Sequence, residues 1–198
     1  MSTDSILIQD VQMEYSVDNR TVTVFDRLNL EIKTDEITVI TGRSGCGKTT
    51  LLRLIAGLEK PTSGAITIPE GINIGMMFQE DRLMPWLRCD KNVSLGMKHV
   101  SKKEVYDILK LVGLEGFEGA YPSQLSGGMR QRVALARTLI RKSNFILMDE
   151  PFAALDGYTR QDMQKELLRI RQDTGTGIIF VTHDVNEATI LGDRIISL

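Results

Sequence analysis

Hydrophobic and polar residues alternate in two runs near the start of the chain, ILIQDVQMEY and TVTVFDRLNLEI, which lie between residues 6 and 32. The turn-like residues VDNR separate these runs, so the pattern predicts two strands joined by a turn. Shorter, mostly apolar runs predict further strands at residues 37–40, 65–68, 72–78, 144–150, 178–181 and 194–198.

Helices are predicted between the later strands. Residues 101–114 place Val105, Ile108 and Val112 at helical spacing, and Ser101 forms a capping box with Glu104. Further helices are predicted at residues 48–57, 129–142, 158–172 and 184–191. Because strands and helices alternate, the sequence indicates an α/β fold with a mostly parallel sheet.

The composition is typical of a soluble globular domain, since 42% of the 198 residues are hydrophobic and 25% are charged. Lys and Arg number 24 against 26 Asp and Glu, so we expect no nucleic-acid partner. With only Cys46 and Cys89 present, we expect no structural disulfide. No apolar run is long enough to span a bilayer and no signal-peptide pattern is found, so we expect a cytosolic protein that reaches membranes through a partner.

The strongest motif lies between the predicted strand at residues 37–40 and the helix that follows. Gly42, Gly47, Lys48 and Thr49 fit the phosphate-loop pattern G-x-x-x-x-G-K-[ST]. The glycines allow backbone N–H groups to surround phosphate oxygens, Lys48 can reach the β- and γ-phosphates, and the Thr49 hydroxyl can bind Mg²⁺. The sequence therefore predicts a nucleoside triphosphate site.

Polar residues follow three other predicted strands. The run at 72–78 ends at Gln79, the run at 144–148 leads into Asp149 and Glu150, and the run at 178–181 leads to His183. The C-terminal ends of parallel strands share one edge of a sheet, where ligands bind. Asp149 can approach a loop-bound Mg²⁺, and Glu150 can polarise an attacking water. For His183, a hydrogen bond to the γ-phosphate and a bond to backbone both stay open.

Weaker signals come from a Ser-Gly-Gly element and from one tyrosine. Ser126, Gly127 and Gly128 stand at a predicted helix start, where they could form a second anion cradle. Tyr15 could stack on an adenine ring or could be an ordinary half-buried strand residue. The arginines of the following helix do not form one stripe, so we expect most to be solvated or ion-paired: Arg130, Arg132, Arg137 and Arg141.

An apolar loop follows Gln79. It contains Leu83, Met84, Pro85 and Trp86, and the proline excludes a regular helix. Exposed, these residues would form a docking patch, and buried, they would cap a subdomain. We favour the docking patch.

The motif LSGGMRQR at residues 125–132 completes an order of parts that resembles the ATP-binding subunit of ABC transporters, over essentially the whole chain. IGMMFQEDRLMPWL is most similar to the importers of nitrate, sulfonate and taurine. The resemblance implies a P-loop NTPase core with a mostly parallel sheet, an N-terminal antiparallel β subdomain and a helical subdomain. It places the core at about residues 1–78 and 143–198 and the helical subdomain at about 79–142, within a single domain of residues 1–198.

The resemblance also implies a role for each motif. ATP would be bound by Tyr15, stacked on the base, and by the Walker A loop, Gly42, Arg43, Ser44, Gly45, Cys46, Gly47, Lys48, Thr49 and Thr50. The signature residues would add Ser126, Gly127, Gly128 and Gln131. Mg²⁺ would be held by Thr49, Gln79 and Asp149, and catalysis would use Lys48, Gln79, Glu150 as base and His183 as switch histidine. Residues 154–156 would form the D-loop.

The family's ATP sites lie between the Walker A loop of one subunit and the signature of another. The resemblance therefore implies a homodimer closed by ATP, bound to transmembrane permease subunits on the inner face of the cell membrane. An importer would also use an extracytoplasmic solute-binding protein.

Two rival functions are disfavoured. A non-transport ATPase of the same superfamily, acting on nucleic acid or ribosomes, would carry a coiled-coil insertion or two modules, but only about 75 residues separate the phosphate loop from the signature, without sustained heptads. A regulatory subunit without turnover is disfavoured because Lys48, Asp149, Glu150 and His183 are all present.

Overall fold

A parallel sheet forms the centre of the structure, with strand order β5-β6-β7-β3-β8. The computed structural model describes residues 4–18, 20–153 and 155–198. The sheet consists of β3 (Ile37–Thr41), β5 (Ile74–Met77), β6 (Phe145–Asp149), β7 (Gly177–Val181) and β8 (Arg194–Ser197). All pairings within it are parallel, so the C-terminal strand ends meet at one edge, as the strand and helix pattern predicts.

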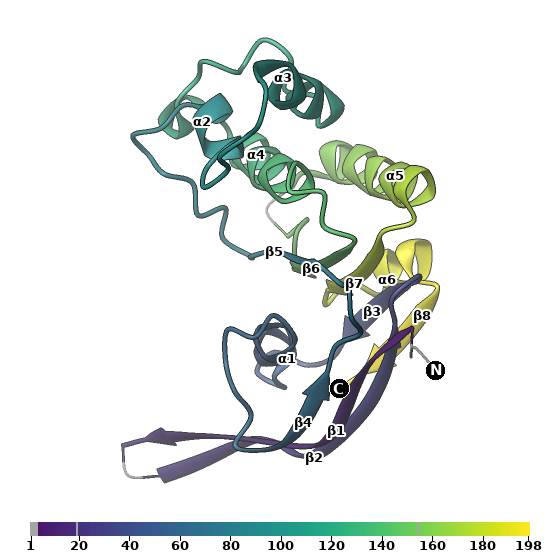
Figure 1. Cartoon of the computed structure of the whole chain (residues 1–198). Helices are drawn as coiled ribbons and strands as arrows, with labels where there is room; N and C mark the ends of the chain where they lie inside the picture. Colours follow the sequence, from purple (N-terminus) through teal and green to yellow (C-terminus); the bar gives the residue numbers. More distant parts are fainter. Residues whose placement is uncertain (1–3, 19, 154) are drawn as a thin grey trace.

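A second, antiparallel sheet has the order β2-β1-β4. It is built from β1 (Ser5–Val17), β2 (Arg20–Lys33) and β4 (Ser63–Thr67). The predicted N-terminal strand pair is confirmed, and the predicted strand at residues 65–68 joins it. Figure 1 shows helix α1 (Lys48–Ile55) between this sheet and the parallel one.

The side-chain alternation of the parallel strands divides the core into two layers. On one face, the apolar side chains of β6 and β7 pack with α1 and the antiparallel sheet; they are Phe145, Leu147, Ile179 and Val181. On the other face, alternate residues of the same strands pack against the remaining helices; they are Ile146, Met148, Ile178 and Phe180. Burial on both faces explains why these strands are continuously apolar in sequence.

The remaining helices are α2 (Cys89–Val93), α3 (Lys102–Leu111), α4 (Gly127–Leu139), α5 (Gly157–Thr174) and α6 (Val185–Leu191), and a 3₁₀ turn spans Pro122–Gln124. Figure 1 shows α2, α3 and α4 at the end of the molecule opposite the antiparallel sheet. The capping box of Ser101 and Glu104 is confirmed at the start of α3. None of the helices in the described part of the chain has the length and apolar character that a bilayer crossing requires.

Helix α2 was not predicted, because it is short and its first N–H group, that of Cys89, is held by the distant Ala120 carbonyl at 2.9 Å. A local side-chain contact adds to this. Asn92 is fully buried, and its amide donates to the carbonyl oxygens of Met84 and Leu87 at 3.1 and 2.8 Å. The Asn92 Oδ1 also accepts the Met84 N–H at 2.8 Å. A five-residue helix has no amphipathic period that the sequence could reveal.

Candidate functional site

The phosphate loop joins β3 to α1 in backbone conformations that require glycine. Gly45 and Gly47 adopt φ values of 81° and 99°. A Cβ on Gly47 would lie 2.6 Å from Val24 Cγ1 and 2.8 Å from Phe25 Cζ. Because β2 packs closely beneath the loop, a larger residue at position 47 would displace either the loop or the β2 side chains.

Lys48 lies inside the loop and is only 7% exposed. Its Nζ donates to the carbonyl oxygens of Gly42 and Arg43 at 2.9 and 3.0 Å. The ammonium is therefore held by neutral acceptors, and its charge faces no carboxylate in these contacts. This arrangement suits an anion bound by the loop, because a buried cation is stabilised by a negative partner.

Thr49 and Asp149 come together beside the loop. The Thr49 hydroxyl donates to Asp149 Oδ2 at 2.8 Å. Asp149 is 4% exposed, and burial raises the pKa of its carboxyl, while the Thr49 hydrogen bond opposes the shift. A hydroxyl and a carboxylate at this distance are oxygen ligands of the kind that Mg²⁺ takes beside phosphates, so the residues present fit this ion.

Gln79, Glu150 and His183 meet around one carboxylate. Gln79 Nε2 donates to Glu150 Oε2 at 3.2 Å, and His183 Nδ1 lies 3.6 Å from Glu150 Oε1. Glu150 has a positive φ of 46°. A non-glycine residue in this conformation is strained, and such strain gathers at functional sites. The predicted convergence of strand ends is thus observed.

An open cleft of about 520 Å³ connects these groups. Its lining comes from the loop, the strand ends and β2: Val24, Ser44, Gly45, Gly47, Lys48, Thr49, Thr50, Gln79, Glu150 and His183. Val24 was missed, since a valine in an alternating strand carries no distinguishing signal. Cys46 lies in the crowded turn, where a Cβ on Gly42 would be 2.7 Å from its sulfur, and both cysteines are free.

Tyr15 lies on β1 and is half-buried. Its hydroxyl donates to Glu59, which also pairs with Arg53 Nη1 at 3.2 Å. Burial, followed by the Glu59 hydrogen bond, raises the pKa of Tyr15, while Thr50 opposes the shift. Tyr15 is not among the residues that line the cleft. Both interpretations of its role therefore stay open.

The Ser-Gly-Gly element lies at the start of α4, as predicted. The Ser126 hydroxyl caps the helix by accepting the Met129 N–H at 3.2 Å. Gln131, further along the same helix, is buried. These residues do not line the cleft described above. Within the expected D-loop, Ala154 lies outside the described residues.

The arginines in and after α4 differ in part from the expectation that most of them are solvated or ion-paired. Arg130 is ion-paired with Asp81 at 2.9 Å, as predicted. Arg137 instead donates to the carbonyl oxygens of Asp81 and Arg82 at 2.6 and 2.8 Å, and burial lowers its pKa. Arg132 on α4 likewise donates to a backbone carbonyl, and so does Arg141, which follows the helix and is exposed, as predicted. These guanidinium groups hold loops in place because an arginine carries several donors in a fixed fork.

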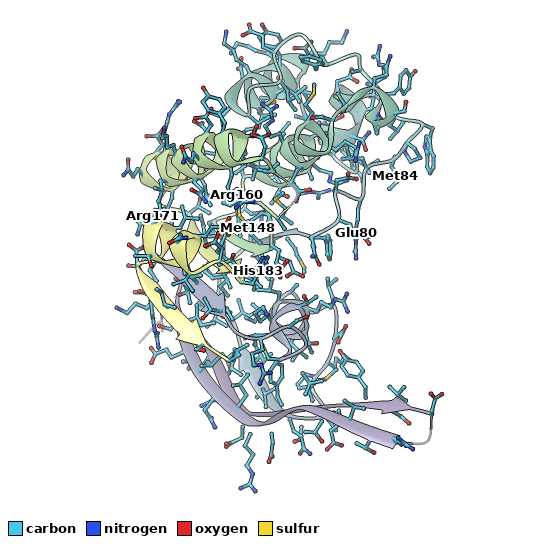
Figure 2. The ribbon with its side chains drawn as sticks, turned by 180° about the vertical axis from the view of Figure 1, so that it is seen from behind. Glu80, Met84, Met148, Arg160, Arg171 and His183 are labelled. Atoms are coloured by element: carbon cyan, nitrogen blue, oxygen red, sulfur yellow. The ribbon has the colours of Figure 1, made fainter. Side chains whose placement is uncertain are left out.

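The apolar loop after Gln79 is divided between core and solvent. Leu83 packs against the core, whereas Trp86 is 70% exposed. Figure 2 shows Met84 in this loop, beside the helical end of the molecule. Trp86 is therefore exposed, as the docking interpretation requires, whereas Leu83 is packed, as the capping interpretation requires.

The fold and the cleft define a P-loop nucleoside triphosphatase. The chain belongs to the ABC transporter family, whose model matches residues 25–153. It is an ATP-binding subunit of this family and an ATPase.

Named relatives cover most of the chain. It is 46% identical over 96% of its length to an uncharacterized ABC transporter ATP-binding protein of Methanocaldococcus jannaschii, of which it covers 76%. It is 47% identical over 88% of its length to an aliphatic sulfonates import ATP-binding protein of Shouchella clausii (71% covered). A taurine import ATP-binding protein of Burkholderia pseudomallei is 40% identical over 96% of the chain (78% covered).

A solved structure has the same fold. The dimeric post-hydrolysis state of the ATP-binding cassette MJ0796, bound to ADP and Pi, superposes with a TM-score of 0.89. That structure is 33% identical in sequence, and the match covers 98% of this chain and 94% of the other. The likeness supports the predicted ABC ATPase fold.

Proposed function

We propose that this ATPase powers an ABC importer of sulfonate- or taurine-type solutes. The main observation that supports ATP hydrolysis at this site is the cleft, which brings together Lys48, Gln79, Glu150 and His183. The importer assignment is supported by the names of the relatives from Shouchella clausii and Burkholderia pseudomallei. Partner subunits would select the solute, and this chain would contribute the energy-coupling step.

The loop residues 42–50 would hold the phosphates of ATP. Lys48 would exchange its carbonyl acceptors for phosphate oxygens, and the N–H groups at the start of α1 would point toward the same anion. Thr49 and Asp149, with Gln79, would hold Mg²⁺, which neutralises charge on the phosphates. Tyr15 would stack on the adenine ring.

Glu150 would act as general base. Its carboxylate would accept the proton of the attacking water, and the Gln79 amide would keep one of its oxygens oriented through the 3.2 Å hydrogen bond. His183, which follows the end of the neighbouring strand β7, would hydrogen-bond the transferred phosphoryl group. Lys48 would stabilise the negative charge that phosphoryl transfer spreads over the oxygens.

The complete site would need a second subunit. Ser126, Gly127, Gly128 and Gln131 belong to the signature motif, yet they do not line the cleft of their own chain. A partner copy would bring this motif to the γ-phosphate, so ATP would close a homodimer. The helical subdomain at residues 79–142 would be the part that carries the motif.

The permease would dock on the loop from Arg82 to Trp86, holding the ATPase at the inner face of the cell membrane. Trp86 is the exposed aromatic residue of this loop. Aromatic residues that become buried in an interface supply much of its binding energy. An extracytoplasmic solute-binding protein would complete the import system.

The deciding experiment measures ATPase rate per subunit against protein concentration, for wild type and Glu150→Gln, together with light scattering in Mg-ATP. We expect a rate that rises with concentration, a variant at least about a hundredfold slower, and its accumulation as an ATP-bound dimer. A concentration-independent rate in a strict monomer would contradict the composite site. Wild-type turnover by Glu150→Gln would contradict its role as base.

A further inference from the structure

A buried carboxylate outside the predicted motifs lies behind the reaction centre. Glu187, on helix α6, is 6% exposed. Burying a carboxylate is costly unless hydrogen bonds and a cation compensate for lost water. Its contacts therefore indicate what it stabilises.

Glu187 holds the backbone next to His183. Its Oε2 accepts the Thr182 hydroxyl hydrogen at 2.6 Å, in a bond buried from solvent. The Thr182 Oγ1 in turn accepts the Asp184 N–H at 3.0 Å. Glu187 thus fixes the residue before His183, and Thr182 fixes the residue after it.

Arg160, on helix α5, is the cation that faces Glu187. Its Nε lies 3.7 Å from Glu187 Oε1, and its Nη1 lies 3.8 Å from Asp184 Oδ2. Its Nη2 donates to the Leu155 carbonyl at 3.1 Å. Figure 2 shows Arg160 between α5 and the segment of His183. This guanidinium therefore joins the chain after Glu150 to the chain around His183.

The contacts of Glu187 and the proposed reaction centre border the same small cavity. Glu150 and His183 line about 50 Å³ of space together with Arg160, Thr182 and Glu187. His183 itself is an exposed side chain. Its direction thus depends on how firmly its backbone is held.

We propose that Glu187 is a positioning residue that, with Arg160 as its charge partner, orients His183 toward Glu150. The inference rests on the proposed role of His183 in phosphoryl transfer. Because Glu187 acts through His183, its removal affects the chemical step and leaves ATP binding intact. Displacing a reacting group by about 1 Å can slow a reaction by a factor of 10².

The test is a double-mutant cycle of steady-state ATPase activity, with Glu187→Ala, His183→Ala and the double variant. We expect Glu187→Ala to lower kcat at least about tenfold and to change the KM for ATP by less than about twofold. In the His183→Ala background, Glu187→Ala should cost less than about a further twofold, because residues that act as a unit are not additive. Additive losses, or a raised KM, would show a general structural role and overturn the proposal.

Two further variants keep the test decisive. Glu187→Gln retains an oxygen acceptor for Thr182 but loses the charge that faces Arg160, so its kcat should lie between those of wild type and Glu187→Ala. Asn186→Ala changes the exposed neighbour on the same helix and should leave kcat unchanged. If Glu187→Ala does not fold, the cycle is run with Glu187→Gln, and additivity there rejects the proposal equally.

The two hypotheses fail in different ways. If His183→Ala keeps wild-type turnover, the proposed role of His183 is wrong. If His183→Ala slows turnover but neither Glu187 variant does so in the wild-type background, the role of His183 stands and the positioning role of Glu187 is wrong.

Discussion

Thr49 and Asp149 lie 100 positions apart in sequence, and the Thr49 hydroxyl donates to Asp149 Oδ2 at 2.8 Å. The contact forms because α1, which follows β3, packs against β6. It joins two of the residues that we propose hold Mg²⁺.

The first prediction concerns this pair. Thr49→Val removes the hydroxyl ligand and Asp149→Asn removes the charge, so each should raise the Mg²⁺ concentration for half-maximal ATPase about tenfold or more. The measurement is ATPase activity titrated with Mg²⁺ at saturating ATP. An unchanged Mg²⁺ requirement in a folded variant would exclude that residue from the metal site.

Two glycines of the phosphate loop offer a matched comparison. Gly45 and Gly47 both have positive φ, but a Cβ on Gly45 meets nothing within 4 Å, whereas one on Gly47 meets Val24 and Phe25. Gly45→Ala should therefore lower the free energy of unfolding by about 1 kcal/mol, and Gly47→Ala by roughly 3 kcal/mol. Urea unfolding at pH 7 checks the difference. Equal losses would mean that the contact with β2 is relieved at no cost.

Tyr15 can be tested for base stacking by separating its ring from its hydroxyl. Tyr15→Phe keeps the ring and loses only the bond to Glu59, so the KM for ATP should change little. Tyr15→Ala should raise the KM about tenfold, because stacking of an aromatic ring on a base contributes roughly 1–3 kcal/mol. If Tyr15→Ala binds ATP as wild type does, the residue is an ordinary strand tyrosine.

Glu104 provides a pH prediction. The Ser101 N–H, then the Lys142 ammonium, and the Ser101 hydroxyl lower the pKa of Glu104 from 4.5 to about 2. A depressed folded pKa means that the charged form stabilises α3 above pH 4.5, and this stabilisation is lost as pH falls from 4.5 toward 2. Glu104→Gln should thus melt at a lower temperature than wild type at pH 7, and the difference should shrink below pH 4.5. A difference independent of pH would contradict this.

A direct check on Glu104 is its NMR titration. Lys142→Gln removes one cause of the shift and should raise the pKa of Glu104 from about 2. An unaltered titration would show that the Ser101 cap alone sets it.

The last prediction concerns permease docking. Trp86→Ala removes a ring that is 70% exposed, so ATPase activity of the isolated subunit and its melting temperature should stay within about 20% and 2 °C of wild type. Uptake in vesicles that contain the permease should fall about tenfold or more. Unchanged uptake would reject Trp86 as a docking residue.

Local chemistry explains why much of the site could be predicted. The phosphate loop is contiguous, and the spacing of its glycines, Lys48 and Thr49 is enough to propose a role for each. Gln79, Asp149 and His183 could be placed because each follows an apolar strand, and parallel strands share one C-terminal edge. The capping box of α3 was equally local.

Other features could not be predicted, because they depend on contacts between distant segments. Helix α2 begins at Cys89, whose N–H donates to the Ala120 carbonyl of a later segment, and Arg137 binds carbonyl oxygens more than fifty positions earlier in the chain. Arg160 and Glu187 lie on different helices, so no contiguous motif contains both, and their pairing could not be predicted.

The sequence by itself determined which chemical groups the site offers: a glycine-rich loop that we propose binds phosphates, a hydroxyl and a carboxylate that we propose hold Mg²⁺, and a glutamate and a histidine after strand ends. Only the tertiary structure decided which of these groups touch. The order β5-β6-β7-β3 brings Gln79 and His183 to opposite sides of Glu150, and the crossing of α1 brings Thr49 to Asp149. The physical reason is that side-chain identity is local, whereas distances between side chains follow from strand order and from the packing of helices on the sheet.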